Sequence, residues 1–406
     1  MKDVTVIGAG ASGLVAACFA AQRGNRVRIL ERNEKSGKKI YITGKGRCNV
    51  TNDVSAEGVL ENVVRNPRFL MSSVHAFPPS LLMDFLEAGG LVLKVERGNR
   101  VFPASDKASD VTKCLEGYCR RAGVEFVFGS RVQSVGKTAE GRFEVRTDAE
   151  CYYSDAVVVA TGGISYPATG STGDGYSIAE SFGLKTTPRR AALVGIVCDM
   201  QDIASLQGLS LRNVRVTARR GAKELGSFFG EMLFTHFGVS GPIVLSLSSL
   251  LSDIDLSSIS LYIDLKPALD EATLDRRLLR DFEKNKNKQL CHALDELLPK
   301  SLVLPVLRAA KIPAQCPVNS LQKEKRAALL SVLKAFPLAP RSLRPAEEGI
   351  VTAGGVDVKE LDPKTMECKK VSGLYFCGEV IDVDAYTGGF NLQIAFSTGH
   401  AAGCAI

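Results

Sequence analysis

The feature that most constrains the fold is the N-terminal stretch of residues 4–17. A short β-branched run ends in a glycine turn and continues into an Ala-rich segment typical of a helix. Gly8, Gly10 and Gly13 have the spacing G-x-G-x-x-G, which in a βαβ unit lets a pyrophosphate approach bare backbone at a helix N-terminus. A second predicted strand, residues 26–30, ends at Glu31, whose carboxylate would accept hydrogen bonds from a ribose. These features together predict a dinucleotide site rather than an ordinary βαβ turn that binds nothing.

Length and composition narrow the class of protein. The 406 residues are enough for two or three domains, and 45% hydrophobic with 23% charged residues is typical of a globular protein. No apolar run approaches a membrane span, and the first apolar run leads into the glycine turn rather than a signal-peptide cleavage site. Eleven cysteines without C-x-x-C pairs indicate reduced thiols in the cytoplasm and no metal site.

Charge gives a weaker indication of partners. The net charge of +7 carries no long basic block, so it favours an anionic cofactor or small-molecule substrate, and we expect no nucleic-acid partner. Residues 32–52 form a basic loop punctuated by glycines. Because the loop follows the ribose-binding strand directly, we expect it to face the cofactor rather than solvent. The sequence leaves the oligomeric state open.

The pattern at the start of the chain, short apolar strands that end in glycines, returns at its end. A buried strand at 156–160 runs into Thr161, Gly162 and Gly163, and a late strand ends at Glu379 before a glycine pair opens a last helix. Between them lie alternating β segments and then Leu stripes of helical period. We therefore predict an α/β fold: a Rossmann-like domain built from both chain ends (1–190 and 345–406), an inserted antiparallel β domain (191–266 and 337–344) and a helical bundle within it (267–336).

The late strand favours FAD over NAD. A carboxylate at Glu379 can hydrogen-bond ribitol hydroxyls, and the helix start at residues 390–393 can stabilise negative charge on a reduced flavin. The single G-x-G-x-x-G leaves no separate nicotinamide domain, so NAD(P)H would dock only transiently as electron donor.

Four long segments, residues 37–52, 160–176, 233–242 and 375–399, resemble the bacterial aminoacetone oxidase-like or BaiN-like NAD(P)/FAD-dependent oxidoreductases, a family of two-dinucleotide-binding-type flavoproteins. The resemblance spans nearly the whole chain, except that residues 184–195 match less closely. It implies an FAD site, with Glu31 at the adenosine ribose and Val132 at the adenine. The residues that the motifs and the resemblance together assign to the cofactor are Gly8, Gly10, Ala11, Ser12, Gly13, Glu31, Arg32, Lys39, Gly44, Arg47, Cys48, Asn49, Val132, Thr161, Gly162, Gly163, Glu379, Asp382, Gly389, Phe390, Asn391, Leu392 and Gln393.

Three functions remain open. The first is NAD(P)H-dependent reduction of a small enone-like substrate, the second oxidation of small amines by dioxygen, and the third, more remote, a flavin-holding RNA-modification or scaffold protein. The candidate proton donors are Tyr166 and His236, with Tyr386 as a further pocket residue, although a lone histidine in an apolar segment is more often a core residue. The cations around Cys48 would lower the pKa of its thiol, but no partner for a redox disulfide is near in sequence, so we interpret Cys48 as a flavin contact.

Overall fold

A computed structural model describes residues 1–201 and 203–406, which fall into two compact units. The sheet unit comprises residues 1–192 and 346–406, and the barrel unit comprises residues 193–345. Both chain ends therefore belong to one unit.

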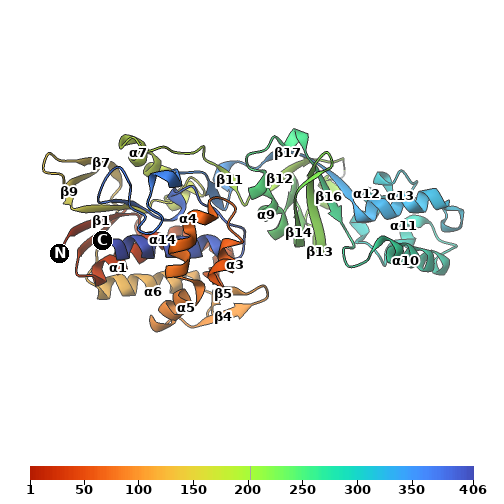
Figure 1. Ribbon diagram of the computed structural model, residues 1–406. Helices are drawn as coiled ribbons and strands as arrows, with labels where there is room; N and C mark the ends of the chain where they lie inside the picture. Colours follow the sequence, from red (N-terminus) through yellow and green to blue (C-terminus); the bar gives the residue numbers. More distant parts are fainter. Residues whose placement is uncertain (202) are drawn as a thin grey trace. The chain divides into compact units, whose positions relative to one another are not determined.

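The sheet unit is built on a five-stranded parallel sheet in the order β19-β10-β1-β2-β6 (Figure 1). Its strands are β1 (Asp3–Ile7), β2 (Arg26–Glu31), β6 (Glu125–Phe128), β10 (Ala156–Val159) and β19 (Leu374–Phe376). The central strands are apolar because helices and loops cover both faces. The Rossmann-like sheet predicted from the sequence is confirmed, and β19 brings the C-terminal part of the chain into it.

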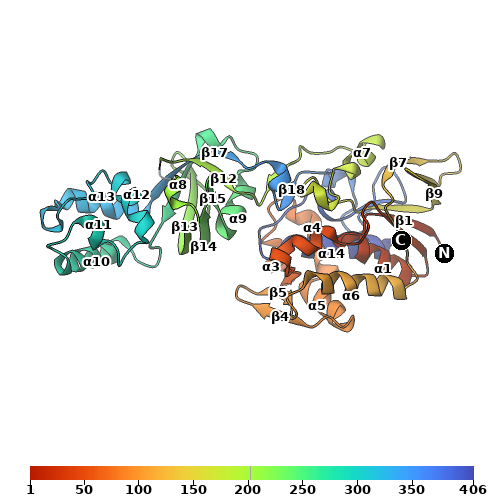
Figure 2. The same cartoon turned by 180° about the vertical axis from the view of Figure 1, so that it is seen from behind.

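Two helices from opposite ends of the chain, α1 (Ala11–Gln22) and α14 (Phe390–Ala405), lie side by side in both views (Figures 1 and 2). Glycines make the close approach: a Cβ on Gly399 would lie 2.4 Å from the Ser12 carbonyl oxygen, and one on Gly403 would lie 2.6 Å from that of Ala16. The C-terminal helix is thus packed on the helix that begins at the glycine turn.

The remaining elements of the sheet unit surround this core. They include two small antiparallel sheets, β3-β5-β4 and β7-β8-β9, and the β11-β18 pair. Their bounds are α2 (Lys38–Ile42), β3 (Thr51–Asn52), α3 (Ala56–Leu60), α4 (Pro67–Ala76), α5 (Pro79–Ala88), β4 (Leu93–Glu96), β5 (Arg100–Pro103), α6 (Ala108–Arg121), β7 (Val132–Lys137), β8 (Phe143–Thr147), β9 (Cys151–Ser154), α7 (Asp174–Ser181), β11 (Arg190–Ala192) and β18 (Val351–Ala353), with 3-10 turns at Thr43–Gly46, Pro167–Thr169, Ala346–Glu348, Val358–Glu360 and Gly378–Val380.

The barrel unit contains the antiparallel β region that the sequence predicts, closed into a barrel in the order β12-β15-β14-β13-β16-β17. Its strands are β12 (Ile196–Asp199), β13 (Ser210–Arg220), β14 (Lys223–Phe234), β15 (Gly238–Ser240), β16 (Ser260–Asp264) and β17 (Phe336–Leu343). In β16 the alternation is clean, because Leu261 and Ile263 are fully buried while Ser260 is exposed. Closure leaves this sheet without a free edge.

Helices complete this unit. They are α8 (Ile203–Leu206), α9 (Pro242–Leu251), α10 (Glu271–Lys284), α11 (Leu290–Ala293), α12 (Lys300–Ala309) and α13 (Lys323–Lys334), with 3-10 turns at Leu256–Ser258 and Val318–Ser320. Helix α9 packs on strand β14, and α10 to α13 form a group at one end of the barrel (Figure 2). The Leu stripe of residues 290–297 predicts a longer helix than α11, which ends at Ala293 because the chain turns there. Among the described residues, no helix is long and apolar enough to cross a membrane.

Candidate FAD site

The glycine turn between β1 and α1 has the shape that a bound pyrophosphate needs. Gly8 has a φ of +104°, and a Cβ there would lie 2.6 Å from the Ala160 carbonyl oxygen. A Cβ on Gly13 would lie 2.0 Å from the Gly8 carbonyl oxygen, so both positions require glycine. A Cβ on Gly10, in contrast, would meet no atom within 4 Å. Open space therefore lies in front of the helix N-terminus, beside the first turn of α1 at Ala11 and Ser12.

The carboxylate of Glu31, at the end of β2, is buried and fixed by hydrogen bonds. Its Oε2 accepts from the Ala9 backbone N–H at 2.8 Å, and its Oε1 accepts from both the backbone and the side-chain nitrogen of Asn33 at 2.8 and 2.7 Å. The acid that the sequence predicts at the ribose is thus tied to the glycine turn. Because three donors restrain the carboxylate, its orientation is fixed.

The basic loop returns to the same turn. Gly37, in the left-handed region at a φ of +68°, donates its N–H to the Ala9 carbonyl oxygen at 2.8 Å. Lys39, two residues further, pairs with Glu379 at 2.6 Å. The loop therefore lies between the glycine turn and the late strand, as expected for a segment that faces the cofactor.

Glu379 joins segments that are far apart in the sequence. Besides Lys39, its carboxylate accepts from the Thr352 backbone N–H at 2.8 Å and from the Ser165 hydroxyl at 3.3 Å. Gly163 lies against the same group, since a Cβ there would lie 2.2 Å from Thr352 Oγ1 and 2.9 Å from Glu379 Oε1. Ser165 and Thr352 escaped the sequence analysis, because only the folded chain brings them to the carboxylate.

Several buried oxygens of this region have no hydrogen-bond partner within the described part of the chain. They are Asn49 Oδ1, Thr161 Oγ1 and Asp382 Oδ1. The carboxylate oxygens of Asp384 accept no hydrogen bond from the described residues either, but Oδ1 is ion-paired with Arg65. Buried polar atoms are normally satisfied, so unsatisfied oxygens indicate where a polar ligand belongs. The open space at Gly10 and these oxygens fit a cofactor with a pyrophosphate and a hydroxylated chain, as FAD has.

Asp384 is a buried acid whose pKa is strongly shifted. Its side chain is fully buried, and its Oδ1 lies 3.3 Å from Arg65 Nε. Burial raises the pKa of Asp384 to about 7; the Arg65 cation opposes this rise, and the carboxylates of Asp382 and Glu379 add to it. Asn66, next to Arg65, donates its side-chain N–H to the Asp382 carbonyl oxygen at 2.7 Å. Arg65 and Asn66 were missed because no motif marks them.

Gly389 caps the N-terminus of helix α14. It has a φ of +101°, and a Cβ there would lie 2.3 Å from the Thr51 carbonyl oxygen. By position, the N–H groups of Phe390, Asn391 and Leu392 have no helical acceptor, so they form the positive end of the helix. The Gln393 side chain is buried and bonded to Thr51, Phe77 and Ser397. The Asn391 side chain is bonded to the backbone of Ala385 and Tyr386. These two residues therefore offer a ligand their backbone, while their side chains shape the turn.

Four residues predicted to contact the cofactor make contacts within the protein. Arg32 pairs with Asp174 at 3.2 Å. Arg47 pairs with Glu96 and with Asp106 and lies over the Phe102 ring. Gly44 has a φ of +56° and packs near the Asn49 backbone N–H. Val132, at the start of β7, is buried, with its backbone in the β7-β8 ladder.

Cys48 differs from the prediction. The expectation that neighbouring cations lower the pKa of its thiol is wrong: the side chain is fully buried, and burial raises the pKa of Cys48 to about 12. The Arg47 guanidinium is engaged by two carboxylates instead. Cys48 has a φ of +58°, which marks a tight bend in the loop.

The candidate proton donors lie in both units. Tyr166 has a φ of +53°, an uncommon backbone conformation for a bulky residue. Tyr386 is half-buried just before the glycine pair at α14, and burial, with a smaller effect of Asp384, raises the pKa of its phenol. His236 is exposed and belongs to the barrel unit, with its ring edge against Phe237.

The fold and the site define a Rossmann-type flavoprotein oxidoreductase. The model of the family described as HI0933-like protein Rossmann domain matches residues 2–405, and the chain belongs to this family. The family resemblance inferred from the four motif segments is confirmed.

Relatives match over nearly the full chain. The Escherichia coli (strain K12) protein named "Ribosomal RNA dihydrouridine synthase" is 34% identical over 402 residues, which are 98% of this chain and 96% of that protein. The Clostridium scindens protein named "3-dehydro-bile acid delta(4,6)-reductase" is 32% identical over 407 residues, 99% of this chain and 98% of that protein. The solved 3-ketosteroid delta1-dehydrogenase of Sterolibacterium denitrificans has a TM-score of 0.53 at 12% identity and covers 99% of this chain and 98% of its own, a likeness of fold.

Proposed function

We propose that this protein is an FAD-dependent reductase that saturates a carbon–carbon double bond conjugated to a carbonyl, with NAD(P)H as the reductant. The names of two full-length relatives support this reaction class. Making dihydrouridine saturates the C5=C6 bond next to a uracil carbonyl, and a delta(4,6)-reductase acts on unsaturated carbons of a 3-oxo steroid-like ring. Both acceptors are electron-poor alkenes, although one is a base in RNA and the other a small molecule.

One observation carries the proposal: buried oxygens without partners at Thr161 and Asp382 occur in the same unit as the open glycine turn and the positive end of α14. The turn suits a pyrophosphate, and the oxygens suit a polyhydroxyl chain. The helix end is suited to negative charge, which a flavin carries on its pyrimidine edge after accepting two electrons. A site with this sequence of features is suited to FAD more than to NAD.

Saturation of the acceptor needs a hydride and a proton. FAD, when bound, supplies the two-electron chemistry that links the reductant to the acceptor. The Lys39–Glu379 pair holds the basic loop against the late strand, and the α14 N-terminus favours the anionic reduced state. The phenol of Tyr386 is protonated at neutral pH, as tyrosine phenols are, so it carries a proton that it can donate. Tyr166, on a strained backbone, is the second candidate donor within the sheet unit.

The test is anaerobic mixing of the FAD-loaded protein with NADH or NADPH while the visible flavin absorbance is followed. We expect rapid bleaching with one of them, and recovery of the colour when a conjugated enone or a uridine-containing RNA oligonucleotide is added. No bleaching with either nucleotide would refute the reductase. Bleaching by aminoacetone with recovery in dioxygen would instead establish an amine oxidase.

A matched pair of variants tests the proton donor. We expect Tyr386→Phe to lower the rate of acceptor reduction by about 10²–10⁴ while leaving bleaching by NAD(P)H unchanged. Tyr166→Phe is the comparison, because it removes a phenol from the other candidate position. If neither variant slows the acceptor step, the proton comes from another group, and His236→Gln is the next variant.

A further inference from the structure

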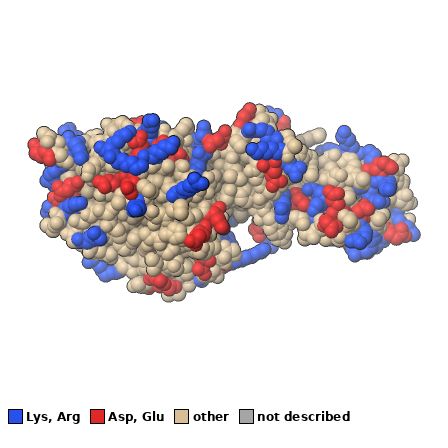
Figure 3. Space-filling model, in the orientation of Figure 1, with Lys and Arg blue, Asp and Glu red and all other residues tan. Residues whose placement is uncertain are grey.

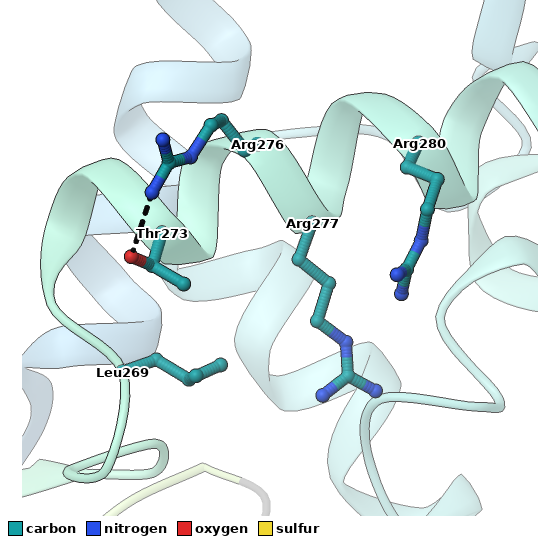
Figure 4. A pocket seen from close by; sticks show the side chains of 5 residues that line it. All are labelled: Leu269, Thr273, Arg276, Arg277 and Arg280. Carbon is teal, nitrogen blue, oxygen red and sulfur yellow. Dashed lines mark hydrogen bonds between the residues drawn. The ribbon is translucent and has the colours of Figure 1, made fainter.

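The helical part of the barrel unit contains a pocket of about 420 Å³ lined by Leu269, Thr273, Arg276, Arg277 and Arg280, with no acidic lining residue (Figure 4). Thr273 and the three arginines follow the spacing i, i+3, i+4, i+7, so they share one face of α10. The neighbouring face of the same helix buries Leu274, Leu278 and Phe282 in the core. The arginines are therefore carried by a helix that is fixed to the unit.

The guanidinium groups are positioned by a few polar contacts. Arg276 donates to the Thr273 hydroxyl at 3.1 Å. Asp281, nearly buried, accepts from Arg277 at 3.4 Å and from Arg280 at 3.2 Å. One carboxylate thus orients two arginines, while the arginine nearest the helix start bonds a neutral hydroxyl.

The unit does not neutralise the charge that it gathers here. Lys266 also stands close, since its pKa is lowered by burial and by the charge of Arg277. The Asp270 carboxylate caps the helix by accepting from the Thr273 backbone N–H at 2.6 Å. The three arginines and Lys266 therefore outnumber the carboxylates of Asp270 and Asp281 that bond to this helix. Basic and acidic side chains are interspersed over the visible face of this unit (Figure 3), whereas the residues that line the pocket include no acid.

We propose that this arginine pocket binds phosphate groups. The planar guanidinium fork matches two phosphate oxygens at once. The forks of Arg277 and Arg280 lie near each other on one helix, and that of Arg276 is turned toward Thr273 (Figure 4). The volume is that of a small-ligand site. The phosphate comes from an RNA strand or from a free phosphorylated small molecule such as a dinucleotide. This proposal stands on the barrel unit alone and is independent of the proposed flavin chemistry.

The experiment measures binding of two probes to the FAD-loaded full-length protein. One is a fluorescein-labelled single-stranded RNA oligonucleotide, followed by anisotropy over a series of salt concentrations, and the other is inorganic pyrophosphate, followed by calorimetry. The test variant is Arg276→Ala/Arg280→Ala, which removes two exposed side chains. The control is Lys286→Ala/Lys288→Ala, which removes the same charge from the exposed loop after α10.

We expect the arginine variant to bind at least one probe about tenfold or more weakly, and the lysine variant to bind like the parent. For RNA, losing two phosphate contacts should reduce the slope of log affinity against log salt by about 1.4. If the arginine variant binds only RNA more weakly, the phosphate that the pocket binds belongs to an RNA strand. If the variant also binds pyrophosphate more weakly, the pocket binds free phosphate groups. Three results would each overturn the proposal: unchanged binding in the arginine variant, an equal loss of binding in the lysine variant, or no binding of either probe to the parent.

A preference for a poly-glutamate peptide over both probes would also overturn it. Bleaching by NAD(P)H should be unaffected, which separates this outcome from failure of the flavin proposal.

Discussion

The sheet unit and the barrel unit bury different kinds of side chain. The sheet unit buries the carboxyl groups of Glu31, Glu360, Asp382 and Asp384, whereas the one buried carboxyl group described in the barrel unit is that of Asp281. Burying a charged group destabilises a fold unless partners compensate. The sheet unit therefore maintains a polar interior that the fold alone does not need, and the barrel unit has an apolar one.

We therefore infer that the two units differ in what their buried residues do: those of the sheet unit bind the cofactor, and those of the barrel unit stabilise the fold. In the sheet unit, buried oxygens and tight glycines define where a ligand goes, so changes there should act on cofactor affinity. In the barrel unit, the core is aliphatic and aromatic, so changes there should act on stability. The following predictions test whether the two effects separate in this way.

The largest effect is expected for Leu261→Ala in the barrel. Leu261 is fully buried on β16, between Ala218 on β13 and Leu338 on β17. Removing a buried leucine side chain costs about 2–5 kcal/mol of unfolding free energy, measured by urea unfolding. Ser260→Ala, the exposed neighbour on the same strand, should change it little. An equally large loss of FAD affinity in Leu261→Ala would show that the two effects do not separate.

Gly10→Ala should lower FAD affinity and leave the stability of the fold unchanged. The added methyl meets no protein atom within 4 Å, so the fold should be kept, but it enters the space that the pyrophosphate needs. We expect FAD affinity to fall about a hundredfold, roughly 2.7 kcal/mol, in a fluorescence titration, with the unfolding midpoint of the apoprotein unchanged. Gly136→Ala is the matched control, because Gly136 also faces open space but lies in β7. Normal FAD binding by Gly10→Ala would remove the turn from the site.

Asp384→Asn tests the buried acid. The pKa of Asp384 is about 7 in the folded protein, against about 3.9 in an unfolded chain. The folded state therefore holds the extra proton, and the stability from this group, complete below about pH 4, is lost as the pH rises through 7. The variant should match the parent at pH 4 and be more stable above pH 7, by about 1.4 kcal/mol for each unit by which the folded and unfolded pKa values differ. Asp199→Asn, at an exposed carboxylate, is the control. A parallel pH profile in parent and Asp384→Asn would contradict the buried-acid account.

Local sequence patterns predicted the parts of the fold that local forces determine. Helix α5 is such a part: the apolar period of residues 79–88 predicts a helix with these bounds, Pro79 starts it, and Leu82 and Leu86 form its buried stripe, although Leu81 on the predicted face is exposed. Helix α9 was not predicted: Ile243 and Val244 look like a strand, and the helix is apolar on most sides because it packs inside the barrel unit. The signal that was available is Pro242 at the first helical position.

The same limit applies to the site. The glycine turn and Glu31 lie within one βαβ unit, so spacing alone predicts their geometry. The bonds of Glu379 to Lys39 and Ser165 span 340 and 214 residues. No local pattern records such contacts, and only the return of β19 to the sheet creates them.

The smallest effect is expected for chemical modification of the buried thiol of Cys48. A thiolate reacts and a thiol does not, so a pKa of about 12 should leave Cys48 unmodified by iodoacetamide in the native protein at pH 8. Cys151, exposed on β9 of the same unit, should be modified first. Mass spectrometry of the digested protein gives both rates at once, and stability and FAD affinity should not change. Cys48 modified as fast as Cys151 with FAD still bound would mean that the basic loop opens around it. In that case the loop would not be the fixed wall of the cofactor site that its bond to the glycine turn indicates.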